Sequence, residues 1–203
     1  MDALRVSALR ASLAGSGWLE CTREFGAELH RAVTRRSARG LLLVGTPAYE
    51  PWHLAAHLTE EAERSGTAGL APVLLRRGGA APGAPAHLSH GLERLAQGAR
   101  GATVLVVTQG AADEVLLERV RDARRGGAAV LAVDGGTAWG SSPAGGASAW
   151  DSTAHRSLAV PDAGPEPFEL VQHLVSAAAG ERPRRGRLER LAGLLAAGPA
   201  PRW

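Results

Sequence analysis

Lysine is absent from this sequence, cysteine occurs once, and aromatic residues make up only 4% of it. Because Cys21 is alone, an intramolecular disulfide and a cysteine-based metal site are both excluded. The sequence also has no apolar run of about 18 residues, so it predicts no transmembrane helix. Its first residues lack the continuous apolar stretch of a signal peptide. We therefore expect a cytoplasmic protein that does not associate with a membrane.

The charge pattern argues against a nucleic-acid-binding protein. Arginine supplies every basic side chain, and the formal net charge is only +3. The arginines are spread along the chain, apart from short clusters at Arg35–Arg36, Arg124–Arg125 and Arg182–Arg190. A nucleic-acid interface needs basic residues gathered on one face, together with aromatics or a reading helix. The 203 residues are enough for one domain with a full core.

Short apolar segments and amphipathic segments alternate along the chain. The predicted strands are Leu41–Gly45, Leu70–Leu75, Thr103–Val107, Ala128–Val133 and Ser157–Val160. The predicted helices have apolar residues at helical spacing, and they are Glu20–Ser37, Pro51–Ser65, His87–Gln97, Asp113–Arg125 and Pro167–Ala179. Continuous apolar strands are typical of a parallel sheet that is covered on both faces. Pro72 favours an edge position for the second strand.

This alternation predicts an α/β protein, a three-layer doubly wound sandwich around a five-stranded parallel sheet, with N-terminal helices. We expect the strand order 2-1-3-4-5, as in flavodoxin-like folds, with Thr103–Asp134 as one strand–helix–strand unit. Residues 1–180 are predicted to form one domain, of which 1–38 is a helical segment, and residues 181–203 a basic C-terminal tail. The glycine-rich segment Gly135–Trp150 is predicted to be a long loop.

In that strand order the first and third strands are neighbours, and ligands bind outside their carboxyl ends. A helix N-terminus, which can hold an anion, follows the first strand, although a plain strand-to-helix turn explains the same residues. The loop Thr108–Asp113 follows the third strand, and Asp113 is also a good N-cap. We predict that a small anionic metabolite binds between these loops, at Gly45, Thr46, Thr108, Gln109, Gly110 and Asp113.

Two histidines, His53 and His57, lie four residues apart on the helix after the first strand, so they share one face, as a metal site requires. The Glu of an HExxH motif is missing and the sequence reveals no third ligand, so we expect no metal ion and no cofactor. Histidine suits acid–base chemistry, which makes His57 the candidate catalytic residue. Gln172 and His173, on the last helix, could reach the ligand from the side, and a solvated helix face is equally compatible with them.

Three segments of the chain resemble one protein family. His53-Leu54-Ala55-Ala56-His57-Leu58 is similar to an HFAAEL motif, and Val104–Gly136 is similar to a strand, turn, helix and strand that end in GxxVIAITG. Val160-Pro161 and Gln172 match a final strand and a helix with glutamine. The family that these motifs resemble is that of sugar isomerase (SIS) domains, and within it the phosphoheptose isomerases. The resemblance extends from about Glu20 to Gly180. The resemblance implies a SIS fold, a phosphosugar ligand, and a homodimer or homotetramer.

The sequence departs from that family at the residues that carry its chemistry. The family's Ser-x-Ser-Gly phosphate turn is here Val107-Thr108-Gln109-Gly110, with one hydroxyl in a shifted position. His57 stands in the place of the family's catalytic Glu, and Gly180 in the place of its catalytic His. The resemblance therefore implies the family's scaffold with an eroded catalytic site.

We predict a phosphosugar-binding protein and leave open whether it is an enzyme. If it is one, it is a divergent sugar-phosphate isomerase in which His57 acts as the base. The alternative is a non-catalytic, dimeric interaction or regulatory protein on the same scaffold. A third interpretation, a flavodoxin-like nucleotide-binding domain, would need Asp134 to contact a ribose.

Overall fold

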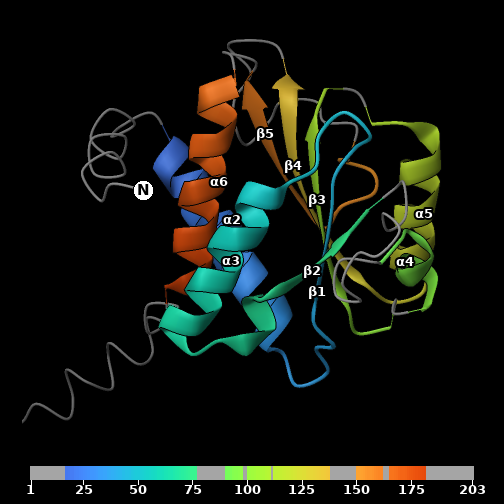
Figure 1. The fold of residues 1–203 in the computed structure, drawn as a ribbon, viewed down its shortest axis with the longest axis horizontal. Helices are drawn as coiled ribbons and strands as arrows, with labels where there is room; N and C mark the ends of the chain where they lie inside the picture. Colours follow the sequence, from blue (N-terminus) through green and yellow to red (C-terminus); the bar gives the residue numbers. More distant parts are fainter. Residues whose placement is uncertain are drawn as a thin grey trace, which may run out of the picture.

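A five-stranded parallel sheet with the order β2-β1-β3-β4-β5 forms the centre of the computed structural model (Figure 1). Its strands are β1 (Leu41–Val44), β2 (Pro72–Leu75), β3 (Thr103–Gln109), β4 (Ala129–Thr137) and β5 (Arg156–Pro161). The order and the parallel pairing confirm the predicted topology, and they place β1 beside β3. Pro72 opens the edge strand β2, where a missing N–H removes no central hydrogen bond.

The structure describes residues 17–76, 90–97, 100–110, 112–137, 150–161 and 165–181. Several predicted segments lie outside this part of the chain. They are most of the loop predicted after β4, the C-terminal tail from residue 182 onward, and residues 1–16 of the predicted N-terminal helical segment.

The described helices are α2 (Trp18–Thr34), α3 (Trp52–Ser65), α4 (Glu93–Gln97), α5 (Glu114–Arg125), α6 (Pro165–Gly180) and the 3₁₀ turn η1 (Ala68–Leu70). The predicted strand Leu70–Leu75 starts two residues late, because Leu70 closes the 3₁₀ turn by donating its N–H to the carbonyl of Thr67. Among these helices none combines the length and the apolar character that crossing a membrane would require.

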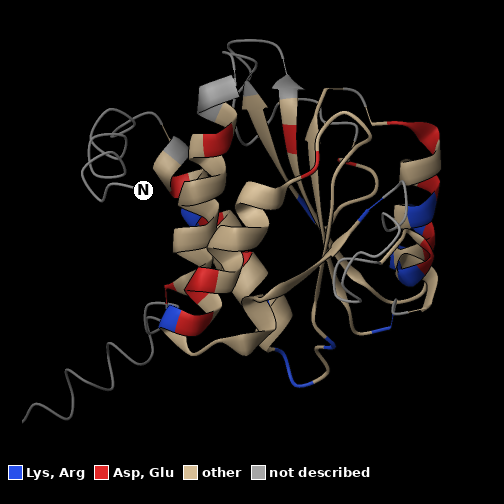
Figure 2. Ribbon diagram, viewed as in Figure 1, with Lys and Arg blue, Asp and Glu red and all other residues tan. Residues whose placement is uncertain are grey.

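Helix α5 packs against the sheet with the apolar stripe that its sequence predicts. Its buried side chains, Leu116, Leu117, Val120 and Ala123, follow helical spacing. Its outer face carries both signs of charge (Figure 2), including the exposed ion pairs Arg121–Glu114 and Arg125–Asp122. Pairs of this kind contribute little to stability, so the apolar stripe is what holds α5 on the sheet.

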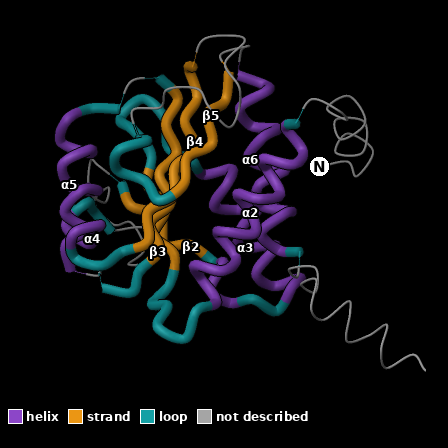
Figure 3. The backbone as a smooth tube through the Cα atoms, turned by 180° about the vertical axis from the view of Figure 1, so that it is seen from behind, coloured by secondary structure: helices purple, strands orange, loops and turns teal. Residues whose placement is uncertain are grey.

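The sheet is sandwiched between two helical layers (Figure 3). Helices α2, α3 and α6 cover one face, and α4 and α5 cover the other. In β1, Leu41 and Leu43 pack in the first layer, whereas Leu42 and Val44 pack in the second. Successive side chains of a strand point to opposite faces, so both sets are buried. This explains why the strand sequences are continuously apolar.

Helices α2 and α6 approach each other closely at Gly26. A Cβ atom at this position would lie 2.5 Å from the Cβ of Ala178 and 2.8 Å from its backbone carbon. Only a glycine leaves room for this approach. Because α6 also carries Gln172 and His173, this close approach helps to position Gln172 against Tyr49 and His173 against His53.

Candidate functional site

The carboxyl ends of β1 and β3 meet at one edge of the sheet, as predicted. Val44 pairs with Val106, so Thr46, in the turn after β1, and Thr108, in β3, each follow this pair by two residues. After β1 the chain makes a tight turn in which Thr46 and Tyr49 exchange backbone hydrogen bonds of 2.9 and 3.1 Å. A Cβ at Gly45 would lie 2.0 Å from the carbonyl oxygen of Tyr49, so glycine is required there.

The side chain of Thr108 points into the protein and not toward a ligand. It is 0% exposed, its hydroxyl donates to Oδ1 of Asp134 at 2.7 Å, and it accepts from Nε1 of Trp150 at 3.3 Å. The loop predicted to begin at Thr108 begins later, because β3 continues to Gln109 by pairing with β4. Asp134 is buried beside Thr108 and its Oδ1 already accepts this hydrogen bond, which argues against Asp134 as a ribose ligand.

Replacing Thr108 with valine should therefore reduce stability by about 1–3 kcal/mol, because buried hydrogen-bonding groups of Asp134 and Trp150 lose a partner. Urea unfolding of the two proteins measures the difference. Thr59→Val on the exposed face of α3 is a matched control, and its effect should stay within about 0.5 kcal/mol. Equal losses in the two variants would contradict the structural role of Thr108.

The loop after β3 is formed by Gln109, Gly110 and Asp113. Gln109 is exposed, and Gly110 has a φ of 88°, which favours glycine. Oδ1 of Asp113 accepts the N–H of Leu116 at 3.1 Å, so Asp113 caps α5 as its position suggested. The N–H of Gly110 donates to the carbonyl of Gly135 at 3.1 Å, so the exposed side chain of Gln109 is the group of this loop that remains open to a ligand.

Gln172 links α6 to the turn after β1. It is 0% exposed, and its Nε2 donates to the hydroxyl of Tyr49 at 2.8 Å. Burial raises the pKa of Tyr49, which keeps this hydroxyl protonated at neutral pH. In the part of the chain that the structure describes, two buried oxygens beside this turn have no hydrogen-bond partner, Oε1 of Gln172 and Oγ1 of Thr46. Such atoms are costly unless something binds them.

Three histidines meet between α3 and α6. Nε2 of His53 and Nε2 of His173 are 2.7 Å apart, and the ring of His57 lies 4.0 Å from that of His173 and 4.6 Å from that of His53, centre to centre. The hydrogen bond requires one of the two bonded rings to be protonated on Nε2 and the other on Nδ1. His53 lies in the first turn of α3, directly after the turn that follows β1, and Gln172, the neighbour of His173, contacts Tyr49 of that turn.

The surroundings favour the neutral imidazoles of His57 and His173. Burial, followed by the charges that His57 and His53 would carry, lowers the pKa of His173 from 6.5 to about 4. Burial and a charge on His53 also lower the pKa of His57, while Glu60 opposes this shift from 3.6 Å away. Three cations so close together would repel one another, and His173 is only 6% exposed. Neutral rings are the form that accepts protons and binds metals.

The donor set also fits a metal ion of the zinc class. Ligand atoms of His53, His57 and His173 all lie within 4.8 Å of one another. Tetrahedral zinc–imidazole bonds place the ligand nitrogens about 3.4 Å apart, so Nε2 of His53 and Nε2 of His173 would separate slightly from 2.7 Å. Three histidines leave the fourth position for water or a ligand. The sequence predicts no metal site because the spacing of His53 and His57 does not reveal His173 as a third donor, which only the packing of α6 against α3 brings beside them.

Comparison with known proteins agrees with this architecture. The sugar isomerase domain of the RpiR transcription factor from Sphaerobacter thermophilus aligns with a TM-score of 0.50 and 18% identity, covering 85% of this chain and 84% of that one. A Silicibacter pomeroyi protein described as a phosphosugar isomerase aligns with a TM-score of 0.51 and 18% identity, covering 91% of this chain. This chain spans 50% of the Silicibacter protein.

No family model matches the sequence, and no curated protein matches it either. The structural likeness is therefore evidence about the fold. The chain has the fold of a sugar isomerase domain, as its motifs predicted.

Proposed function

We propose that this protein binds a phosphosugar at the carboxyl edge of the sheet, between the turn after β1 and the loop after β3. The observation that carries the proposal is the cluster of His53, His57 and His173 beside that edge. The unpartnered buried oxygens of Thr46 and Gln172 add hydrogen-bonding capacity next to it. The exposed side-chain amide of Gln109 would contact the anionic group, and Gly110, whose N–H already donates to Gly135, would leave space for it beside the loop.

The proposed chemistry is proton transfer next to a sugar carbonyl, with His57 as the base. The lowered pKa of His57 keeps its imidazole neutral and able to accept a proton at pH 7. Its side chain is 21% exposed, so a ligand can reach it. If the three histidines instead hold a divalent ion, His57 would be one of its ligands and not the base, and the ion would polarise the carbonyl oxygen of the sugar.

A non-catalytic role on the same scaffold is the second candidate. Two residues favour this candidate. The hydroxyl of Thr108 points into the protein and so is not available to a phosphate-binding turn, and Gly180 has no side chain where the resembled family has a catalytic His. One protein of similar fold is a transcription factor with a sugar isomerase domain. In that case the chain would bind the phosphosugar without converting it, and binding would change the regulatory state of a homodimer or homotetramer.

Thermal unfolding with a panel of aldose and ketose monophosphates tests the binding. Millimolar ligand should raise the melting temperature of the protein with the logarithm of concentration, and the corresponding unphosphorylated sugars should not. His57→Ala should weaken the effect, whereas Thr59→Ala, on the exposed side of the same helix, should preserve it. If no phosphosugar stabilises the protein at millimolar concentration, the proposed function is wrong. Product analysis on the same samples distinguishes the isomerase from the non-catalytic candidate.

A further inference from the structure

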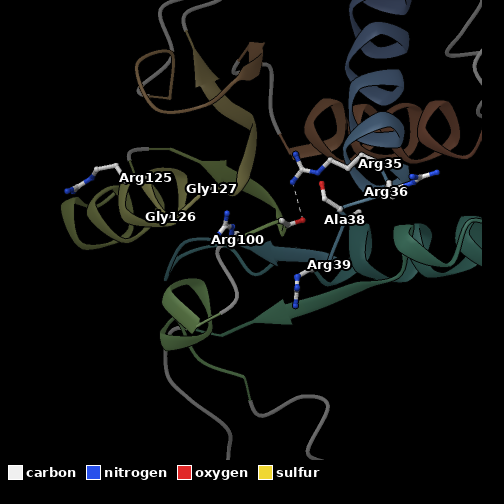
Figure 4. Close-up of a pocket in the computed structure, with 10 residues that line it drawn as sticks. Arg35, Arg36, Ala38, Arg39, Arg100, Arg125, Gly126 and Gly127 are labelled. Atoms are coloured by element: carbon white, nitrogen blue, oxygen red, sulfur yellow. Dashed lines mark hydrogen bonds between the residues drawn. The ribbon is translucent and has the colours of Figure 1, made fainter.

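A concave surface lies at the opposite, amino-terminal edge of the sheet. It is a cavity of about 750 Å³ between the loop after α2, the loop before β3 and the turn between α5 and β4 (Figure 4). Five arginines line it, accompanied by small residues only. The lining residues are Arg35, Arg36, Ser37, Ala38, Arg39, Arg100, Gly101, Arg125, Gly126 and Gly127. None of them belongs to the phosphosugar site.

The charge of this arginine pocket is largely uncompensated. No carboxylate is among the described residues that line it, and Asp122 is the acidic side chain that pairs with one of its arginines, Arg125. Figure 2 shows basic residues without acidic neighbours along the loop after α2. The C-terminal ends of α2 and α5 contribute roughly half a negative charge each. The four remaining arginines, Arg35, Arg36, Arg39 and Arg100, outweigh them.

The loops that present these arginines are tied to one another. Arg39 donates its N–H to the carbonyl of Gly101 at 3.0 Å, and Gly101 donates to the carbonyl of Gly127 at 3.3 Å. The guanidinium of Arg35 donates to the carbonyls of Gly101 and Ala102 at 3.1 and 3.2 Å, which fixes its position. Such a frame is ordered before a ligand arrives, so little entropy is lost on binding.

The lining residues define the ligand chemistry. Guanidinium groups match phosphate oxygens in geometry and charge, and several of them together favour an anion with more than one phosphoryl group. Aromatic side chains on which a base could stack are absent from the residues that line the pocket. Figure 4 shows Arg35, Arg39 and Arg100 around the middle of the opening, whereas Arg125 extends away from it.

We propose that this pocket binds an oligophosphate, a compact chain of two or more phosphoryl groups. The chain is either inorganic polyphosphate or the phosphate arm of a nucleotide, and the arginines recognise the same groups in both. Arg39 and Arg100 also line an adjoining cavity of about 560 Å³ that contains Arg94. A longer phosphate chain therefore reaches a further arginine, so affinity rises from orthophosphate through pyrophosphate to tripolyphosphate.

Isothermal titration calorimetry of the full chain tests this order at about 0.15 M salt, where exposed charges are screened. The probes are orthophosphate, pyrophosphate, tripolyphosphate and ATP. The double variant Arg39→Ala/Arg100→Ala should lower the affinity for tripolyphosphate by about tenfold for each arginine removed. Both side chains are exposed, so circular dichroism should show an unchanged fold. Arg23→Ala, an exposed arginine of α2 outside the pocket, controls for net charge.

The results distinguish inorganic polyphosphate from a nucleotide as the ligand, and they show whether the pocket binds either of them specifically. Equal affinity for ATP and tripolyphosphate assigns the pocket to the phosphate chain alone, and clearly tighter binding of ATP assigns it to a nucleotide. The proposal is overturned if neither binds at about 1 mM, if Arg23→Ala weakens binding as much as the double variant, or if a DNA duplex binds more tightly at the same salt concentration. The phosphosugar response at the other edge should persist in the double variant, so each proposal can fail separately.

Discussion

Zinc at a hundred times its dissociation constant should raise the free energy of unfolding by about 2.7 kcal/mol, and the melting temperature should increase accordingly. The stabilisation arises because the three imidazoles converge only when α3 has packed against α6. An unfolded chain holds His53 and His57 near each other but keeps His173 far away, so it binds the ion more weakly.

Single histidine variants locate this effect. His57→Ala removes a donor whose side chain is partly exposed, so the fold should survive while most of the zinc response disappears. His90→Ala is the matched control, because His90 lies outside the cluster and contacts Arg94. An equal response of the wild-type protein and His57→Ala would contradict a three-histidine site. Magnesium should have no comparable effect, because it prefers oxygen ligands.

Acidification should destabilise the protein through the same histidines. In the folded state the pKa of His173 is lowered from 6.5 to about 4. Between these two values the unfolded chain binds protons that the folded protein excludes, so stability falls as the pH decreases through this window. The loss of stability that His173 causes approaches about 3 kcal/mol as the pH reaches the lower end of this window. The lowered pKa of His57 acts in the same direction.

Urea unfolding at a series of pH values measures how steeply the free energy of unfolding changes with pH. Carboxylates also titrate in the lower part of this range. The informative quantity is therefore the difference in the free energy of unfolding between the wild-type protein and His173→Gln. That difference should shrink as the pH falls from 7 to 4, because the variant has no buried imidazole to protonate. His90→Gln should keep the wild-type slope. Parallel curves for the wild-type protein and His173→Gln would contradict the lowered pKa.

The strands and the cap of α5 could be read from the sequence because both depend on local patterns, and the sheet order followed from the alternation of strands and helices. Apolar runs marked the strands, and helical spacing with Asp113 marked the start of α5. The direction of the Thr108 side chain was harder to predict. It depends on pairing with β4, which extends β3 by two residues beyond the apolar run and turns the hydroxyl toward Asp134.

The histidine cluster and the arginine pocket could not be predicted from spacing, because tertiary packing creates both. His173 lies 120 residues from His53, and only the packing of α6 against α3 joins them. The arginines of the pocket come from loops that are separate in the sequence and adjacent at the amino-terminal edge of the sheet. Arg35–Arg36 and Arg124–Arg125 were visible as pairs, but neither pair indicates a cavity by itself.

Nuclear magnetic resonance of isotope-labelled histidine rings tests most directly whether a phosphosugar binds beside the cluster. The seven histidines of the chain provide internal controls. Titration with an aldose or ketose monophosphate should shift the Cε1 resonances of His57 and His173 in a saturable way. Those of His155, next to the amino-terminal end of β5, and His30, hydrogen-bonded to the end of α6, should stay in place. Unchanged resonances of His57 and His173 at millimolar ligand, or shifts confined to His155 and His30, would contradict the proposed site.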